Sequence, residues 1–228
     1  MSLLSPVKAI FRSLAPGAYQ ALRRLHLVYT MQKDGTSYLL RTGFLKSHEL
    51  GYPCTPEGDA APWMCYPIIR FMEQRLSTQM DVFEYGSGFS TIFWSPRVRQ
   101  LDAVESDREW YEKLAPRFPD NCHVQVVETD GETDASDYVQ APGNTGRKYH
   151  VIIIDGLHRD ECADTVQSFL RDDGIVLLDD TSREFFVPAA ESLQRQGFRS
   201  ISMSGLKPTG FGYDESTIFY RPDNCFGI

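Results

Sequence analysis

Short runs of apolar residues dominate the hydrophobic pattern of this chain from position 82 onward. Residues 82–85, 149–154 and 174–178 consist mostly of Val, Ile, Leu, Phe and Tyr, without a regular alternation of apolar and polar positions. Such runs are typical of parallel strands that are buried on both faces of a sheet. The pattern therefore predicts an α/β protein built around a largely parallel sheet.

Weaker patterns complete the expected elements. Further strands are expected at 100–104, 123–127, 198–203 and 216–221. Helices are expected at 18–30, 68–76, 107–114 and 183–196. Pro188 falls in the first turn of the last helix, where a proline is tolerated. The last two strands are joined by a loop with several glycines, so we expect them to pair with each other.

The composition narrows the class of protein. With 228 residues, 42% of them hydrophobic and 24% charged, the chain suits one α/β domain with an extension. The formal net charge of −8 argues against a nucleic-acid surface, which needs a basic footprint. Five widely spaced cysteines favour free thiols in a reducing compartment, and we expect a cytoplasmic protein. No apolar run approaches the length of a membrane span.

A glycine loop follows the first of these strands. Gly86 allows a sharp turn, Gly88 lets a ligand approach the main chain, and Ser90 or Thr91 can cap the helix that follows. Free N–H groups at that helix start would suit a carboxylate or phosphate. A dinucleotide loop has a third glycine where this chain has Thr91, and Glu84 would repel a pyrophosphate. A plain strand-to-helix turn is the alternative interpretation.

Acidic residues end the other predicted strands. Glu105 lies 19 residues after Gly86, Asp155 follows the run 149–154, and Asp179 and Asp180 follow the run 174–178. In a doubly wound sheet such positions converge on the crevice at the carboxyl ends of the strands, and the first of them is placed to hold ribose hydroxyls.

As a set, these motifs resemble the class I S-adenosylmethionine-dependent methyltransferases, over roughly residues 81–221. The resemblance implies a Rossmann-like sheet of seven strands, mostly parallel, with an antiparallel last strand. It implies S-adenosylmethionine as the cofactor, and an active site lined by Asp155 and Asp179. The cofactor-binding residues that it implies are Glu84, Gly86, Gly88, Ser90, Glu105, Asp130 and Asp155. For Asp130, an ordinary Asp-Gly turn explains the sequence equally well.

We expect methyl transfer to an oxygen, or to a nitrogen, of a small molecule or glycan. His158 lies three residues after Asp155, and a histidine or an aspartate at this position can take a proton from the acceptor. A capping or surface histidine is the alternative for His158. Arg159 is expected either to orient an acidic group of the substrate or to pair with Asp180 or Glu184. A cofactor-binding scaffold or partner subunit without chemistry of its own is the alternative function.

Asp155, Asp179 and Asp180 also raise the possibility of a divalent cation. They nearly match the acidic residues of cation-dependent catechol-type O-methyltransferases, but the glycine loop is shorter here and His158 stands where those enzymes have a lysine. We therefore favour a site without metal. In that case one carboxylate is expected to pair with Arg159 or Arg183, or to bind a proton.

The first 66 residues are expected to form a helical extension with a substrate-side loop, and residues 67–228 the cofactor-binding domain. Leu3, Leu4, Val7, Ile10, Phe11 and Leu14 share one face of an expected first helix. Residues 1–50 carry a net charge of +5 and the remaining residues −13. A basic amphipathic start suits an anionic membrane surface or a partner, whereas packing on the domain or in a homo-oligomer is the commoner outcome. Trp63 is expected to line the substrate site, to anchor the extension, or to do both.

Overall fold

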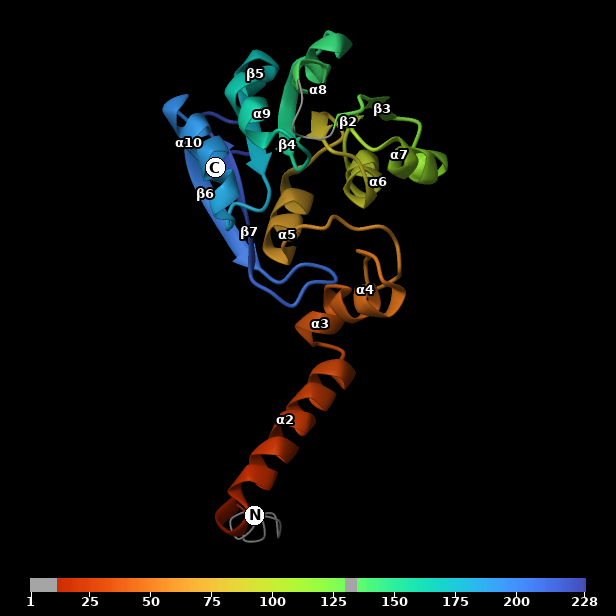
Figure 1. Ribbon diagram of the computed structural model, residues 1–228, viewed down its shortest axis with the longest axis vertical. Coiled ribbons are helices and arrows are strands. Elements are labelled where there is room, and N and C mark those ends of the chain that lie inside the picture. The colour runs from red at the N-terminus through yellow and green to blue at the C-terminus, as the bar shows by residue number, and fades with distance from the viewer. Residues whose placement is uncertain (1–11, 130–134) are drawn as a thin grey trace.

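Seven strands form one sheet in the order β3-β2-β1-β4-β5-β7-β6 (Figure 1). The structure is a computed structural model and describes residues 12–129 and 135–228. Strands β1 to β5 are parallel to their neighbours, and β7 pairs antiparallel with both β5 and β6. The strands are β1 (Asp81–Tyr85), β2 (Gln100–Glu105), β3 (Cys122–Val126), β4 (Tyr149–Ile154), β5 (Leu170–Leu178), β6 (Arg199–Gly205) and β7 (Asp214–Tyr220). This is the expected Rossmann-like sheet of seven strands, mostly parallel, with an antiparallel last strand.

Alternate residues of the central strands enter two separate cores, one on each face of the sheet. Val151 and Ile153 of β4 pack with residues of α5 and α6, whereas Ile152 and Ile154 pack with residues of α8, α9 and α10. All four side chains are fully buried. Because both faces of the sheet are covered, residues 151–154 are apolar on both sides of the strand. This explains the continuous apolar run in the sequence.

Four of the six helices described in this domain, α5, α6, α7 and α10, were expected from the sequence, whereas α8 and α9 were not. The six helices are α5 (Tyr66–Arg75), α6 (Phe89–Trp94), α7 (Arg108–Leu114), α8 (Ser136–Val139), α9 (Arg159–Thr165) and α10 (Val187–Arg195). Pro188 lies in the first turn of α10, as expected. The helix expected from residue 183 begins later, because a separate 3₁₀ turn occupies residues Glu184–Phe186.

Strand register brings the acidic strand ends to one edge of the sheet. Tyr85 at the end of β1 pairs with Val104 of β2 and Ile154 of β4, and Ile154 pairs with Leu178 of β5. The loops that follow these strands therefore begin side by side, and the ligand crevice of a parallel sheet lies at this edge.

The N-terminal region contains α2 (Pro16–Lys33), α3 (Tyr38–Arg41) and α4 (Phe44–Leu50). Helix α2 begins at Pro16 after a non-helical Ala15, two residues before the expected start at residue 18, and it buries none of its residues. Figure 1 shows it projecting away from the sheet. The expected packing of the amphipathic start on the domain or in a homo-oligomer stays a prediction. Of the expected first apolar face, only Leu14 lies within the described residues, and it is 81% exposed. None of the described helices combines the length and the apolar character of a membrane span.

Candidate active site

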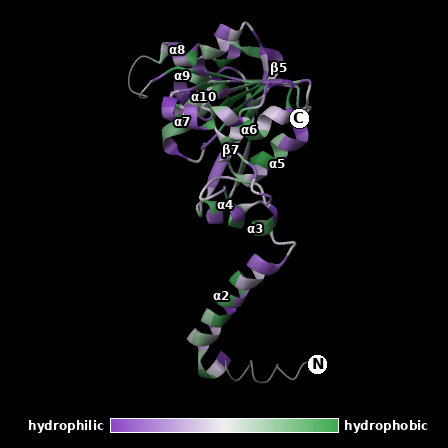
Figure 2. Cartoon of the chain, turned by 90° about the vertical axis from the view of Figure 1, so that its right-hand side faces the viewer, coloured by the Kyte–Doolittle hydropathy of each residue, from purple (hydrophilic) through white to green (hydrophobic). Residues whose placement is uncertain are grey.

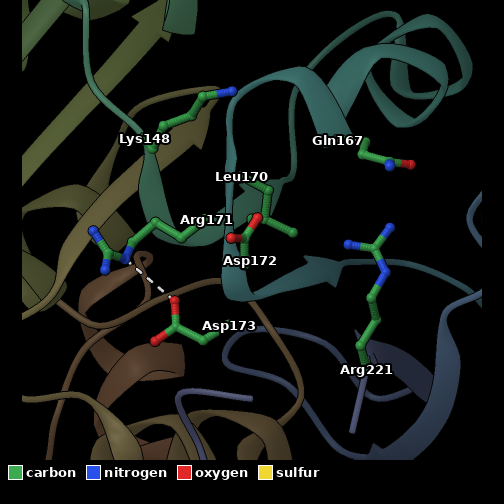
Figure 3. A pocket seen from close by; sticks show the side chains of 7 residues that line it. All are labelled: Lys148, Gln167, Leu170, Arg171, Asp172, Asp173 and Arg221. Carbon is green, nitrogen blue, oxygen red and sulfur yellow. Dashed lines mark hydrogen bonds and ion pairs between the residues drawn. The ribbon is translucent and has the colours of Figure 1, made fainter. Parts of the chain in front are cut away.

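A cavity of about 1060 Å³ lies at the carboxyl edge of the sheet. Its wall includes the glycine loop after β1, the turn after β2 and the turn after β4, together with Tyr52 and Trp63 from the N-terminal region. A second cavity of about 490 Å³ opens at the opposite edge, beside Lys148, Leu170 and Arg221 (Figure 3). Ligands of open parallel sheets bind at the carboxyl edge, so we treat the first cavity as the candidate site.

The N–H groups of the glycine loop itself, before the start of α6, all have partners inside the protein. The N–H of Gly86 donates to Val104 O at 2.9 Å, that of Ser87 to Glu105 Oε2 at 2.8 Å, and that of Gly88 to Thr91 Oγ1 at 2.9 Å. A phosphate cradle requires such groups to point at the ligand. The three N–H groups are all used inside the protein, which argues against a pyrophosphate at this loop.

Thr91 explains why the third glycine of a dinucleotide loop is missing. Its hydroxyl accepts the Gly88 N–H and donates to Glu84 Oε2 at 2.6 Å. Gly88 is the N-cap residue of α6. Thr91, the third residue of the helix, caps its start by accepting the Gly88 N–H. Ser90 lines the cavity in the first turn of the same helix. A glycine in place of Thr91 would break the link between strand β1 and the loop.

Glu84 lies behind the loop and not on the cavity wall. It is 1% exposed, and burial raises its pKa to about 7, an effect that the Ser90 and Thr91 hydroxyls oppose. Its second oxygen, Oε1, is buried without a hydrogen-bond partner among the described residues. Glu84 is therefore a support of the loop that retains one unused acceptor.

Glu105 ties the glycine loop to the turn after β2. Its Oε2 accepts the N–H and the hydroxyl of Ser87, both at 2.8 Å, and its Oε1 accepts the N–H groups of Ser106 and Asp107 at 2.8 and 2.9 Å. A carboxylate has about four acceptor positions, and all are occupied. The Ser87 hydroxyl can rotate away without a main-chain movement, so it marks the acceptor position that a ligand hydroxyl can take.

Trp110 of α7 closes this side of the cavity and was missed in the sequence. Its indole N–H donates to Ser87 O at 2.9 Å, and its ring lies edge-on to Phe89 with centroids 5.8 Å apart. The available signal was an aromatic residue in the helix directly after the strand-ending Glu105. Trp110 fastens the glycine loop to α7 and adds an aromatic wall.

A second residue missed in the sequence, Tyr138, closes the floor of the cavity. Its side chain is 1% exposed, and its hydroxyl is buried without a hydrogen-bond partner among the described residues. The hydroxyl lies where a Cβ of Gly156 would stand, at 2.0 Å from that position. Gly156 is therefore required by the close approach of Tyr138. No sequence signal marked this tyrosine, which lies outside every motif.

Arg159 organises the three carboxylates at the ends of β4 and β5. Its guanidinium donates to Asp155 Oδ1 at 3.1 Å, to Asp180 Oδ2 at 3.4 Å and to the main-chain oxygen of Asp179 at 2.6 Å. Of the two pairings proposed for it from the sequence, the one with Asp180 is present. Arg159 and Asp155 both line the cavity, and the Asp155 side chain keeps 23% of its surface exposed.

The three carboxylates differ in protonation because their partners differ. Burial raises the pKa of Asp155 to about 7 and that of Asp179 well above its usual range, and the neighbouring acids add to both shifts. Burial also acts on Asp180, but Lys207, Arg159 and Arg183 outweigh it and lower its pKa. The Ser216 hydroxyl donates to Asp179, and Lys207 contacts Asp180 at 3.0 Å.

The charged partners of the three carboxylates also bear on whether a divalent cation can bind between them. Asp155, Asp179 and Asp180 offer oxygens within 4.8 Å of one another. Arg159, Arg183 and Lys207 already supply positive charge beside Asp180, and burial favours a proton on Asp179 in the absence of a cation. A site without metal therefore stays the favoured prediction.

His158 begins α9 in a left-handed conformation, with a φ of +51°. Its Nε2 lies 3.1 Å from Thr129 Oγ1, and its Nδ1 lies 3.9 Å from Glu161 Oε1. Leu157 and Arg159 on either side line the cavity, whereas the described wall does not include His158. Its ring is turned toward Thr129, so its role as a base stays a prediction. Asp130 lies outside the described residues.

Aromatic side chains from the N-terminal region also line the cavity. Trp63 is 57% exposed with the Lys207 ammonium 5.8 Å from its ring, and Tyr52 stacks on Phe89 with centroids 5.3 Å apart. The nearby Met64 and Tyr66 are buried in the core. Of the aromatic and apolar residues at 63–66, Trp63 therefore faces the cavity and the others anchor the segment.

Comparison with known proteins yields structural likenesses and no sequence relative. No family model and no curated protein matches the chain. Among solved structures, the chain is similar to a precorrin-6y C5,15-methyltransferase from Geobacter metallireducens (TM-score 0.47, 16% identity, 68% of this chain and 86% of that chain). It is also similar to the N-methyltransferase NodS from Bradyrhizobium japonicum (TM-score 0.49, 11% identity, 68% and 93%) and to a tRNA methyltransferase from Aquifex aeolicus (TM-score 0.48, 11% identity, 70% and 70%).

Proposed function

We propose that this protein is an S-adenosylmethionine-dependent methyltransferase that methylates an oxygen of a small molecule or glycan. The observation that carries the proposal is the cavity at the carboxyl edge of a class I methyltransferase sheet, walled by the Gly86–Gly88 loop and Glu105. Because the loop uses its N–H groups internally, it suits a ligand of hydroxyl, ammonium and ring groups better than a phosphate.

One unused polar atom supports the fit of this cofactor. The Tyr138 hydroxyl is buried without a hydrogen-bond partner among the described residues, and Tyr138 lines the cavity. We assign Gly86, Gly88, Ser90 and Glu105 to the cofactor cradle, with the ribose hydroxyls replacing the Ser87 hydroxyl on Glu105. Asp130 stays a candidate for the adenine. When bound, S-adenosylmethionine supplies an electrophilic methyl group.

Asp155 is the base that the geometry supports best. It faces the cavity, and with a pKa of about 7 it is ionised in a large fraction of molecules near neutral pH. In this role it takes the proton of the acceptor hydroxyl as the oxygen forms its bond to the methyl carbon. Arg159 fixes the carboxylate in place, whereas burial, Asp180 and Glu84 raise its pKa. His158 is the alternative base.

The aromatic part of the cavity wall supports a ring-shaped acceptor. Trp63 presents an exposed face and Tyr52 a stacked one, and both suit a sugar or aromatic ring. The cavity, at about 1060 Å³, has room for an acceptor beside the cofactor. A scaffold without chemistry would have no need of such an open volume, so the catalytic alternative is favoured.

The test begins with binding, by thermal shift and calorimetry. S-adenosylhomocysteine should stabilise the protein, whereas NAD should leave its melting temperature unchanged. Glu105→Gln should weaken S-adenosylhomocysteine binding by about 1–3 kcal/mol, because the charged acceptor is lost. Ser87→Ala is the matched control: it frees an acceptor position on Glu105 and should bind at least as tightly as the unaltered protein. Stabilisation by NAD alone would overturn the proposal.

Transfer is then measured with S-adenosylmethionine labelled in its methyl group and panels of phenols, sugars and amines. Label should appear on hydroxyl acceptors, with a rate that rises as pH increases through about 7 and that is unchanged by chelator. Asp155→Asn should abolish the rise, and His158→Gln should retain it. Labelled amines with no labelled hydroxyl compound would refute the assignment to oxygen, and binding without transfer to any acceptor would favour a scaffold.

A further inference from the structure

Helix α2 exposes a set of apolar side chains that nothing in the described structure covers. Leu22, Leu25 and Tyr29 are 56%, 66% and 59% exposed, and Val28 is 52% exposed. The helix buries none of its residues, and Figure 2 shows hydrophobic and hydrophilic residues along it, away from the sheet. Apolar side chains exposed together in this way mark an interaction surface.

Most of the exposed apolar residues of α2 lie on one side of the helix, whereas Leu27 and Met31 lie outside that side. At about 100° per residue, the residues that follow fall within one arc of about 120°, which we call the α2 stripe. The α2 stripe consists of Ala18, Ala21, Leu22, Leu25, Val28 and Tyr29. Arg24 and Lys33 flank it on opposite sides, each roughly a quarter turn from its centre, whereas Leu27 lies on the far side of the helix.

The charge of this segment is opposite to that of the rest of the chain. Residues 1–33 contain five Lys or Arg and no Asp or Glu, so the remaining residues carry a net charge of −13. Two α2 helices paired through the stripe would bring Arg24 and Lys33 near their copies with no acidic residue to balance them. A basic helix with an apolar stripe is instead complementary to a surface that is apolar inside and anionic at its rim.

We propose that α2 docks on an anionic lipid surface. The α2 stripe enters the boundary of the acyl chains, and Arg24 and Lys33 extend from either side of it to the lipid phosphates. A nucleic acid would use the basic residues and leave the stripe exposed to water, so the lipid accounts for more of the helix. The helix lies on the membrane in this arrangement and does not cross it.

The test uses the full-length protein with vesicles of phosphatidylcholine, alone or mixed with phosphatidylserine, in flotation assays. Binding should require phosphatidylserine and should weaken as salt is added. Leu25→Asp, in the stripe, should reduce binding about tenfold or more, because it places a charge in the acyl boundary. Leu27→Asp is the matched control: it makes the same change at a 59% exposed site on the far side, and it should retain most of the binding.

Four results would overturn the proposal. One is the absence of binding to anionic vesicles. Another is an equal loss in Leu25→Asp and Leu27→Asp, which would leave charge alone as the cause. A dimer in light scattering that Leu25→Asp dissociates would assign the stripe to a second copy. Single-stranded RNA that binds the protein and displaces the vesicles would assign the helix to a nucleic acid. Because α2 buries nothing, both variants should unfold at the same denaturant concentration as the unaltered protein.

Discussion

Gly86 and Gly88 are two residues apart but carry different constraints. Gly86 has a φ of +87°, and a Cβ there would stand 3.1 Å from Asp155 O and Gly156 Cα. Gly88 is extended, and a Cβ there would approach nothing closer than Trp110 Nε1 at 3.6 Å. Gly86 is therefore required by the fold, whereas Gly88 leaves space on the cavity side for a ligand.

We accordingly expect opposite phenotypes from the two alanine variants. Gly86→Ala should lower the free energy of unfolding by about 1–3 kcal/mol, because it combines a disfavoured φ with crowding. Gly88→Ala should change it by no more than about 0.5 kcal/mol but weaken S-adenosylhomocysteine binding about tenfold, because a methyl group enters the ligand space. Urea unfolding and calorimetry measure both quantities. Unimpaired binding in Gly88→Ala would show that the ligand does not approach this residue.

At the scale of elements, the sequence predicted the features that depend on the pattern of neighbouring residues along the chain. Apolar runs gave the central strands, and the acidic residues that end them met at one edge because parallel register aligns the strand ends. The hydrogen bonds within the loops could not be predicted from this pattern, because they join residues far apart in sequence. Arg159 had several acidic candidates, and the fold placed it between Asp155 and Asp180. Trp110 reaches back 23 residues to the oxygen of Ser87.

The contact of α7 with the glycine loop leads to a prediction for that element. Trp110→Phe keeps an aromatic ring but removes the N–H that holds Ser87 O. It should raise the dissociation constant for S-adenosylhomocysteine about 3–10-fold, the equivalent of one neutral hydrogen bond, with little effect on unfolding. Tyr111→Phe on the same helix is the control, because the Tyr111 ring packs on Phe118 away from the loop. Equal effects of the two changes in calorimetry would count against a role of Trp110 in ordering the loop.

For the whole molecule, the buried acidic side chains at the carboxyl edge of the sheet make the free energy of unfolding depend on pH. Glu84 and Asp155 have pKa values of about 7 because the fold buries them, and Asp180 has a lowered pKa because cations surround it. The folded protein thus keeps protons on Glu84 and Asp155 in a pH range where the unfolded chain has lost them. Unfolding in that range releases protons, so stability falls as pH rises.

We therefore expect the free energy of unfolding to decline between about pH 5 and pH 7, by about 1.4 kcal/mol per pH unit for each fully buried group. Glu84 is the clearer contributor, being 1% exposed, whereas the partly exposed Asp155 side chain adds a smaller share. Asp180 acts in the opposite sense but only at lower pH, because its pKa is lowered from the ordinary value of 3.8.

Urea unfolding between about pH 5 and pH 7 measures the slope. Glu84→Gln, which cannot ionise, should make the slope shallower without abolishing it, because Asp155 and the buried Asp179 also have raised pKa values in the folded protein. If the unaltered protein instead gains stability from pH 5 to pH 7, Glu84 is ionised in the folded state, and its unused oxygen has a partner that compensates the charge.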